Sequence, residues 1–257
     1  VRYVVNSHHH PDHTHGNQVF PEAHIIGSRG TRRNILENDL PSLERIIQVV
    51  KDQLERMKKE ESGLKDPGRI DSLREQITTR NDYLQTLLKL TIMAPFVVLD
   101  EYLAITEGSS EARILFMGPG HSDNDTVLFL PADKVLFCGS LLFNDAIPSV
   151  QDAKMLQWMD VLHEILEFDA DRFIPGHGPP GDRQTVEKFI GYFEDLRALV
   201  EPFVARGESL KQAMQDIQLP AKYSRYRFKD LFPSNVQKMY EELKMQQLLS
   251  IPIEGPQ

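Results

Sequence analysis

The alternation of apolar and polar positions divides the chain into three regions. Residues 1–5 are β-branched or aromatic and predict a short buried strand, and residues 24–27 predict a second one. Residues 31–95 are long, charged and helical in pattern. From Phe96 onward the chain returns to short apolar segments separated by Gly, Pro, Asp or Asn, which are typical of strands.

The middle region, residues 31–95, predicts two helices that form an αα-hairpin. Apolar residues at helical spacing follow Ser42, the expected N-cap of the first helix, and residues 61–63 end that helix. Asp66 precedes a proline and starts the second helix, whose apolar stripe continues to Leu88. Such a stripe is typical of a core or of a contact between copies. The hairpin is therefore expected either to roof an active site or to join the chain into a homo-oligomer.

The third region predicts five strands and then helices. The expected strands are Val97–Leu99, Tyr102–Ile105, Ala112–Phe116, Thr126–Leu130 and Val135–Phe137. Helices are expected at about 152–168, at 183–205, from a capping box at Ser209 and Gln212, and at about 233–248. Strands with helices outside them predict a layered α/β fold. No linker stands out, so residues 1–257 are expected to form a single domain with 31–95 as a helical insertion.

Composition and charge narrow the classes of protein. Of the 257 residues, 40% are hydrophobic and 26% are charged, which is ordinary for a soluble chain with a real core. The net charge of −9 argues against a general nucleic-acid or anionic-membrane binder. Cys138 is the only cysteine, which excludes an internal disulfide, and no apolar run approaches eighteen residues. We expect a soluble protein, either cytoplasmic or, if a signal precedes Val1, periplasmic or secreted.

Residues 7–13, Ser-His-His-His-Pro-Asp-His, place four histidines and an aspartate directly after the first strand. Imidazole and carboxylate are the ligand types that zinc and iron prefer. His8 and His10 alternate along an extended segment, so their rings leave the same face and can share one ion. Asp12 and His13 follow a turn at Pro11 and can face a second ion. An expression tag would lack the interleaved Pro-Asp.

Two further histidines lie in glycine-rich loops after predicted strands. His121 stands in residues 118–125 and His177 in residues 174–181. A glycine beside each histidine lets the backbone approach an ion closely. The two loops therefore extend the metal cluster. The remaining histidines are expected to lie beside the site or at the surface (His9 and His15) or to be structural (His24 and His163).

The order H-x-H-x-D-H, then Gly-His, then Gly-His-Gly resembles the metallo-β-lactamase superfamily over nearly the whole chain. The resemblance implies an αββα sandwich with the site at the edge where two sheets meet. It also implies two Zn²⁺ ions as cofactors. On this resemblance one zinc is held by His8, His10 and His121, and the other by Asp12, His13 and His177.

The chain departs from the family pattern at its N-terminus. The family normally has a portion of sheet before the metal cluster, whereas this chain opens on the strand that feeds the cluster. One sheet is therefore expected to lack its N-terminal strands, with an edge and apolar faces uncovered. The cluster is also expected not to mark the natural start of the protein.

The second departure is at residues 138–140, Cys-Gly-Ser. Most hydrolases of the superfamily have an aspartate at the position of Ser140 that bridges the two metals. Some true β-lactamases carry serine there, so the site resembles theirs most, with Ser140 beside the metals. Cys138 lies on the same face as Ser140 by strand alternation and is expected to be buried, with a metal-ligand role as the less favoured alternative.

These features predict a zinc-dependent, β-lactamase-like hydrolase in which hydroxide activated by two zinc ions attacks a small-molecule carbonyl substrate. Asp12 is the expected catalytic residue, because it can hold the second zinc and orient the nucleophile or pass a proton. The alternatives are a lactone or thioester hydrolase with the same metals, and a catalytically degenerate metal-binding protein. A redox iron site is disfavoured by the loss of the bridging carboxylate.

Overall fold

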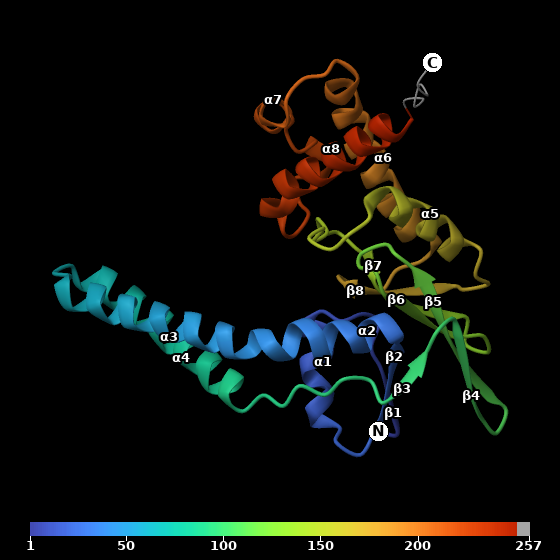
Figure 1. The fold of residues 1–257 in the computed structure, drawn as a ribbon, viewed down its shortest axis with the longest axis horizontal. Helices are drawn as coiled ribbons and strands as arrows, with labels where there is room; N and C mark the ends of the chain where they lie inside the picture. The colour runs from blue at the N-terminus through green and yellow to red at the C-terminus, as the bar shows by residue number, and fades with distance from the viewer. Residues whose placement is uncertain (251–257) are drawn as a thin grey trace, which may run out of the picture.

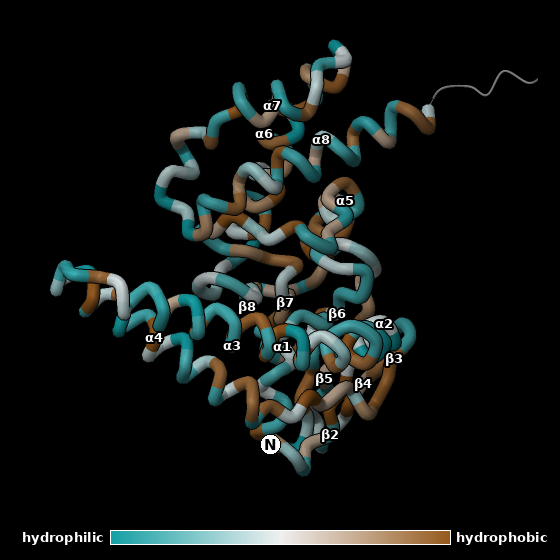
Figure 2. The backbone as a smooth tube through the Cα atoms, turned by 60° about the vertical axis from the view of Figure 1, so that its left-hand side comes forward, coloured by the Kyte–Doolittle hydropathy of each residue, from teal (hydrophilic) through white to brown (hydrophobic). Residues whose placement is uncertain are grey.

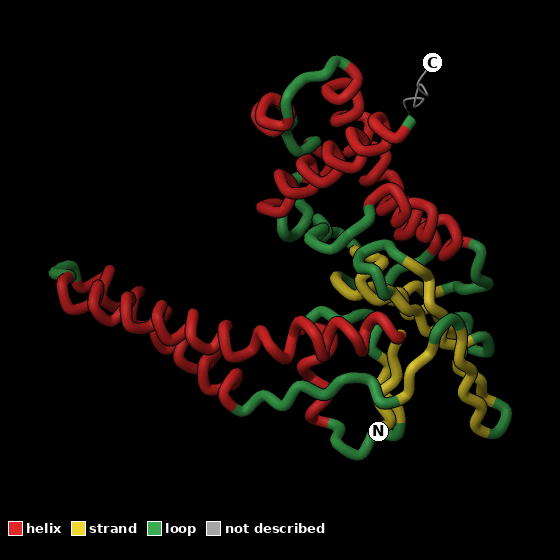
Figure 3. Tube along the Cα trace, in the orientation of Figure 1, coloured by secondary structure: helices red, strands yellow, loops and turns green. Residues whose placement is uncertain are grey.

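The computed structural model describes residues 1–250 and contains two β-sheets with helices on their outer sides (Figures 1 and 3). The first sheet has the order β1-β2-β3 and is parallel. The second has the order β4-β5-β6-β7-β8 and is antiparallel except for its last pair. The strands are β1 (Tyr3–Val5), β2 (His24–Ser28), β3 (Val97–Leu99), β4 (Tyr102–Glu107), β5 (Ser110–Gly118), β6 (Asp125–Leu130), β7 (Val135–Phe143) and β8 (Arg172–His177).

The helices follow the strands as the apolar periodicity predicts. The short helices are α1 (Pro11–Thr14) and the 3-10 turns η1 (His15–Val19), η3 (Ala221–Tyr223) and η4 (Lys229–Leu231). The helices of the second half are α5 (Met155–Leu166), α6 (Arg183–Ala205), α7 (Leu210–Asp216) and α8 (Phe232–Leu249). Ser209 caps α7 as expected, because its hydroxyl accepts from the backbone N–H of Gln212 at 3.2 Å. The predicted capping box is only half formed, since the Gln212 side chain donates to Asp216 at 2.8 Å instead.

The two sheets pack face to face through apolar side chains. Ile26 of β2, Leu99 of β3 and Ile114 of β5 form a buried cluster between them. On its outer side the first sheet is covered by α2, and the second sheet is covered by α5 and α6. Helix, sheet, sheet and helix therefore lie in layers, as the alternation of predicted elements indicated.

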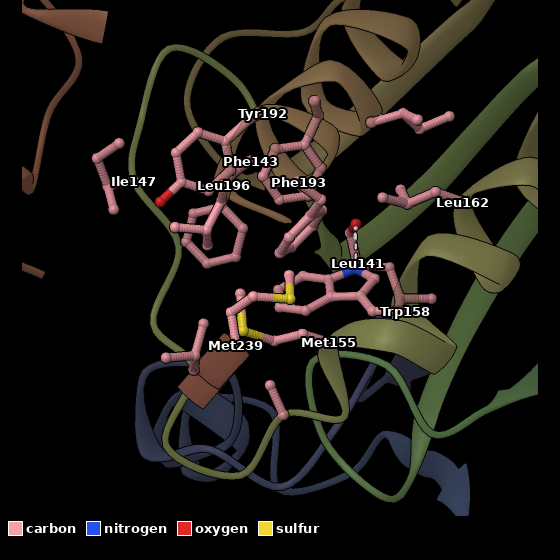
Figure 4. Close-up of a cluster of buried hydrophobic side chains, with 14 of the residues drawn as sticks. Leu141, Phe143, Ile147, Met155, Trp158, Leu162, Tyr192, Phe193, Leu196 and Met239 are labelled. Carbon is pink, nitrogen blue, oxygen red and sulfur yellow. Dashed lines mark hydrogen bonds between the residues drawn. The ribbon is translucent and has the colours of Figure 1, made fainter. Parts of the chain in front are cut away.

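The largest core lies between the second sheet and helices α5, α6 and α8 (Figure 4). Trp158 of α5 is fully buried there, and its indole N–H donates to the carbonyl of Leu141 at 3.0 Å. This bond satisfies the indole's one polar group in an otherwise apolar setting. The labelled side chains around it come from four elements and the loop after β7: Leu141, Phe143, Ile147, Met155, Leu162, Tyr192, Phe193, Leu196 and Met239.

Residues 29–88 form a helical segment whose first helix, α2 (Arg29–Asn34), packs against β2 and β3. The rest of the segment projects away from the sheets as a helical arm (Figure 1), which consists of the π-helical turn η2 (Ile35–Asp39), α3 (Leu40–Gly63) and α4 (Pro67–Leu88). Asp66 caps α4 as expected. Polar residues dominate the outer part of the arm (Figure 2). Both interpretations of the arm, as a roof over the site and as a contact in a homo-oligomer, stay predictions.

The predicted N-cap at Ser42 is wrong. The helix begins at Arg29 directly after β2, and Ser28 is its N-cap, accepting from the N–H of Thr31 at 3.1 Å. Ser42 lies inside α3. A π-helical turn (Ile35–Asp39) precedes Pro41, which has no N–H to donate to a helical hydrogen bond. The chain therefore stays helical through Pro41, and no new helix starts at Ser42.

Strand β7 is longer than the predicted 135–137, because it continues through Gly139 to Phe143. Gly139 has φ +55°, and its pairing with β8 is irregular there. Such a bulge breaks the alternation of faces. The expectation that Cys138 shares the face of Ser140 is accordingly wrong: Cys138 is fully buried in the large core, and burial raises the pKa of its thiol.

An apolar groove of about 590 Å³ lies between the sheets, beside the edge strand β1. Its walls include Val5 from the first sheet and Ile105 and Leu128 from the second, and it reaches His13 of the histidine cluster. The short first sheet thus leaves apolar surface exposed between the layers. Across residues 1–250, no helix combines the length and apolar character needed to cross a membrane.

Candidate metal centre

The histidine cluster follows β1 and is divided by a short helix. Pro11 occupies the first turn of α1, where its missing N–H is not needed. The N–H of His13 and the hydroxyl of Thr14 both donate to the carbonyl of His10, at 3.0 and 3.1 Å. This turn separates His8 and His10 from Asp12 and His13, as the sequence predicted.

His8, His10 and His121 form a first group, hereafter the first trio. Nδ1 of His10 lies 3.0 Å from Nε2 of His8 and 3.0 Å from Nε2 of His121. Three ring nitrogens therefore converge on one point. His8 and His121 are buried, so water does not solvate these nitrogens freely.

Asp12, His13 and His177 form a second group, hereafter the second trio. Oδ2 of Asp12 lies 3.3 Å from Nε2 of His13 and 3.5 Å from Nε2 of His177, and the two nitrogens are 3.5 Å apart. The side chain of Asp12 is 58% exposed. This trio is therefore the more open side of the centre.

Both trios have the donor chemistry and spacing that zinc requires. Tetrahedral zinc with bonds near 2.0–2.1 Å to nitrogen or oxygen places neighbouring ligand atoms roughly 3.4 Å apart. Two separations in the first trio and all three in the second lie between 3.0 and 3.5 Å, and the ligand atoms of each trio all lie within 4.8 Å of one another. Three neutral imidazoles in one trio, and two imidazoles with a carboxylate in the other, are borderline donors of the kind zinc accepts. The residues present thus fit two zinc ions, each with a position left open.

The protonation states favour metal binding. Burial lowers the pKa of His8 and His121 well below the usual histidine value, and the neighbouring histidines lower it further. Burial also lowers the pKa of His177. The hydrogen bond from His13 holds the pKa of the Asp12 carboxyl below its usual range. These shifts favour the unprotonated form of His8, His121 and His177 and the ionised form of Asp12, which are the forms that bind a metal.

The loop that carries His121 is shaped by Asp125, the first residue of β6. Its carboxylate accepts from the N–H groups of Gly120 and Ser122 at 3.1 and 2.8 Å, and from the Ser122 hydroxyl at 2.7 Å. Burial raises the pKa of Asp125 to about 7, while these hydrogen bonds act in the opposite direction. Asp125 therefore fixes the turn that points His121 toward His10.

The floor of the centre is aromatic. The His121 ring lies 5.3 Å from Trp158, and the His177 ring stacks on Phe143 with centroids 4.6 Å apart. Trp158 and Phe143 belong to the large core, so both metal-facing histidines rest on well-packed side chains. Such backing restricts ring rotation and holds the nitrogens in place.

Ser140 lies beside the second trio, as expected, with its hydroxyl 3.0 Å from Nε2 of His13. A Cβ at Gly176 would approach this hydroxyl to 2.7 Å, so the neighbouring strand needs glycine there. Among the other histidines, His9 is nearly buried beside the first trio and His15 Nε2 lies 4.0 Å from Asp39 Oδ2 at the base of the arm. The structure brings the six predicted ligands together, and their role as ligands stays a prediction.

Sequence reasoning missed two polar residues next to the centre. Asp152 accepts from His10, with its Oδ2 2.8 Å from Nε2 of that ring, although the two residues are 142 positions apart. Asn124 donates from its amide to Nδ1 of His9 at 3.0 Å. Asn124 stands in the loop after His121, where a polar run offered a weak signal, whereas nothing near Asp152 in the sequence indicated its contact.

Comparison with known proteins identifies relatives of this chain. The sequence profile described as "Metallo-beta-lactamase superfamily" matches residues 1–177. The type 2 metallo-beta-lactamase of Bacteroides fragilis is 30% identical over 90 residues, which are 33% of this chain and 36% of that protein. A "Beta-lactamase-like protein 2 homolog" of Caenorhabditis elegans is 32% identical over 80 residues, 31% of this chain and 26% of that protein. The matches thus span between about a quarter and just over a third of the length of these curated relatives.

A solved structure of a metallo-beta-lactamase from Pontibacter korlensis superposes with a TM-score of 0.52 at 17% identity, covering 76% of this chain and 69% of that one. The structure of DIM-1 metallo-beta-lactamase exposed to ceftazidime gives a TM-score of 0.50 at 17% identity, covering 74% and 66%. At this identity the likeness concerns the fold. The predicted αββα class is confirmed.

Proposed function

The chain belongs to the metallo-beta-lactamase superfamily, and on that premise we propose that it is a zinc-dependent hydrolase of small carbonyl substrates. The main support for the proposal is the pair of trios, in each of which the ligand atoms lie within 4.8 Å of one another. Membership of this superfamily supports a metal-dependent hydrolase in general. The identity of the metal as zinc, the presence of two ions and the carbonyl substrate are proposed here in addition to that general activity.

The donor sets assign a role to each predicted ligand. His8, His10 and His121 would hold one zinc ion, and Asp12, His13 and His177 would hold the other. When bound, two such ions lower the pKa of a water between them to near neutrality and polarise a carbonyl oxygen. The site needs no serine or cysteine nucleophile, which agrees with the burial of Cys138 in the core.

Asp12 has the properties expected of the catalytic residue. Its carboxylate is ionised and anchored by His13 and His177 on one side, while more than half of its side chain faces solvent. A water at this exposed side can donate a hydrogen bond to the carboxylate, which orients the nucleophile and can accept its proton.

The substrate class that we favour is the lactam. The reasoning is that Ser140 stands where a bridging carboxylate is found in most hydrolases of the superfamily, while some β-lactamases carry serine there. The relative named as a type 2 metallo-beta-lactamase agrees with this choice. Lactones and thioesters have the same reacting carbonyl and are the alternatives that an assay must separate.

The test is a panel of chromogenic β-lactam, lactone and thioester substrates assayed with protein of known metal content. We expect about two zinc per chain and turnover of β-lactams that chelation abolishes and added zinc restores. Turnover of a lactone or thioester but not of a β-lactam would show that the protein is a hydrolase with a different substrate class. Two zinc ions without turnover of any substrate would indicate a degenerate metal-binding protein, and iron in place of zinc would reject the proposal.

A further inference from the structure

Asp152 contacts the first trio from outside. Its Oδ2 lies 2.8 Å from Nε2 of His10, while Nδ1 of the same ring faces His8 and His121. A carboxylate only accepts hydrogen bonds, so Nε2 of His10 must carry the ring proton in this contact. In the neutral ring Nδ1 then keeps its lone pair for the trio.

The chain holds Asp152 firmly in this position. It lies in the loop between β7 and α5, next to Ala153, which is fully buried. The N–H of Lys154 donates to the carbonyl of Gly120 at 2.9 Å, which ties this loop to the one that carries His121. The loop that carries Asp152 and the loop that carries His121 are therefore held together by a backbone hydrogen bond.

His9 is a second histidine that lies near the Asp152 carboxylate. Its Nε2 lies 3.9 Å from the same Asp152 oxygen, and its Nδ1 accepts from the Asn124 amide at 3.0 Å. Asn124 is buried and accepts in turn from the Thr31 hydroxyl at 2.8 Å. The side chain of Asp152 is 42% exposed, so the carboxylate stays solvated on one side and faces two imidazoles on the other.

We propose that Asp152 is a positioning residue of the metal centre, which holds His10 in the tautomer and orientation in which Nδ1 binds the metal of the first trio. The inference rests on the proposed function, because it assumes that the trio binds zinc. A carboxylate on the outer nitrogen of a metal-binding histidine fixes the ring and increases its basicity, and losing such a partner typically lowers metal affinity about 10–100-fold.

The test is a competition titration of zinc against a chromophoric chelator, with the variants Asp152→Ala and Asp152→Asn. We expect Asp152→Ala to weaken one of two zinc sites by roughly 10–100-fold. Asp152→Asn should lose less, because an amide oxygen still accepts from Nε2–H. The matched control is Asp169→Asn, an aspartate that is 81% exposed, pairs with Lys134 and precedes β8 at the end opposite to His177; its zinc affinity should not change.

A second readout needs no metal. Nitrogen-detected NMR of the metal-free protein should assign the Nε2–H tautomer to His10 in the wild type, and a mixture of tautomers in Asp152→Ala. Equal zinc affinity and an unchanged tautomer in Asp152→Ala would overturn the inference. Loss of a whole zinc equivalent would also overturn it, since Asp152 would then be a ligand. A wild type that binds no zinc would instead reject the proposed function itself.

Discussion

The hydroxyl of Ser140 lies 3.0 Å from Nε2 of His13, the nitrogen that also faces Asp12 and His177. Ser140 is 1% exposed, so the hydroxyl is a fixed neighbour of the second trio. A hydroxyl in this place can bond to a ligand, but it brings no charge to the centre. The second trio therefore has one carboxylate, Asp12, to balance a metal ion.

Replacing Ser140 with alanine should raise zinc affinity at the second trio slightly, by less than about tenfold. In the zinc-free protein the hydroxyl bonds to Nε2 of His13, the nitrogen that would bind the metal, and one neutral hydrogen bond is worth about 0.5–1.5 kcal/mol. Chelator competition measures this change. His13→Ala is the reference, since it removes a ligand atom and should abolish binding of that zinc. A loss for Ser140→Ala as large as that for His13→Ala would mean that the serine itself binds the metal.

His121→Ala and His177→Ala should each remove one zinc, since each takes one donor from a different trio. Hydrolysis should fall by at least about a hundredfold in both variants, because both ions take part in activating the water and the carbonyl. Elemental analysis and substrate turnover measure the two effects. His163→Ala is the matched control: its ring bonds to Met159 on its own helix and lies outside both trios. Full zinc content in His121→Ala would reject the assignment.

Much of the fold was predictable because local patterns determine it. The helical stripes and the strand alternation predicted most of the elements, although β8 (Arg172–His177) was not among the five predicted strands, and Asp66 was correctly identified as a helix cap. Ser42 was misidentified because a π turn carries the helix through Pro41, and no propensity rule signals such a turn. The predicted range of β7 was too short, because a glycine such as Gly139 usually ends a strand. Here Gly139 has a positive φ and forms a bulge inside the strand.

The site was predictable where its residues are chemically distinctive and local. Histidines spaced along one loop, or placed after glycine, mark metal ligands by type and spacing. Asp152 could not be predicted in this way. One aspartate among the 38 acidic residues has no local signal, and its contact with His10 exists only because β7 and α5 bring that loop back to the cluster.

The stability of the zinc-free protein should depend on pH through two opposing groups. Burial lowers the folded-state pKa of His8 and His121 below the unfolded value of 6.5. Below pH 6.5 the unfolded chain therefore takes up protons that the fold excludes, and stability is lost as pH falls. Burial raises the pKa of Asp125 from 3.8 to about 7, so as pH falls the folded chain protonates this carboxyl before the unfolded chain does. This carboxyl therefore adds stability as pH falls from about 7 toward 4.

Asp125→Asn separates the two effects, because it keeps the histidines and removes the carboxyl. From pH 7.5 to 5.5 the free energy of unfolding of the zinc-free variant should fall by on the order of 2 kcal/mol, about one per buried histidine. The wild type should lose less over the same interval. Urea unfolding at both pH values measures this, and identical slopes for the two proteins would show that Asp125 has an ordinary pKa in the fold.

The last prediction concerns Glu242 of α8, which lies outside the residues matched by the family profile. Its carboxylate accepts from the first N–H groups of α5, those of Met155 and Leu156, at 2.9 and 3.0 Å. A negative charge at a helix N-terminus contributes about 0.3–2 kcal/mol, depending on how buried it is. Glu242→Gln should therefore lower the free energy of unfolding of the zinc-free protein by about 1 kcal/mol.

Glu241→Gln is the control for Glu242→Gln, since Glu241 is exposed and accepts from Gln237 one turn away on its own helix. Its stability should change by less than about 0.5 kcal/mol. Because α5 begins three residues after Asp152, loosening its first turn should also weaken zinc binding at the first trio, although Glu242 touches no predicted ligand. Urea unfolding and chelator competition on the same samples test both parts. Equal behaviour of the two variants would show that the C-terminal helix is not coupled to the centre.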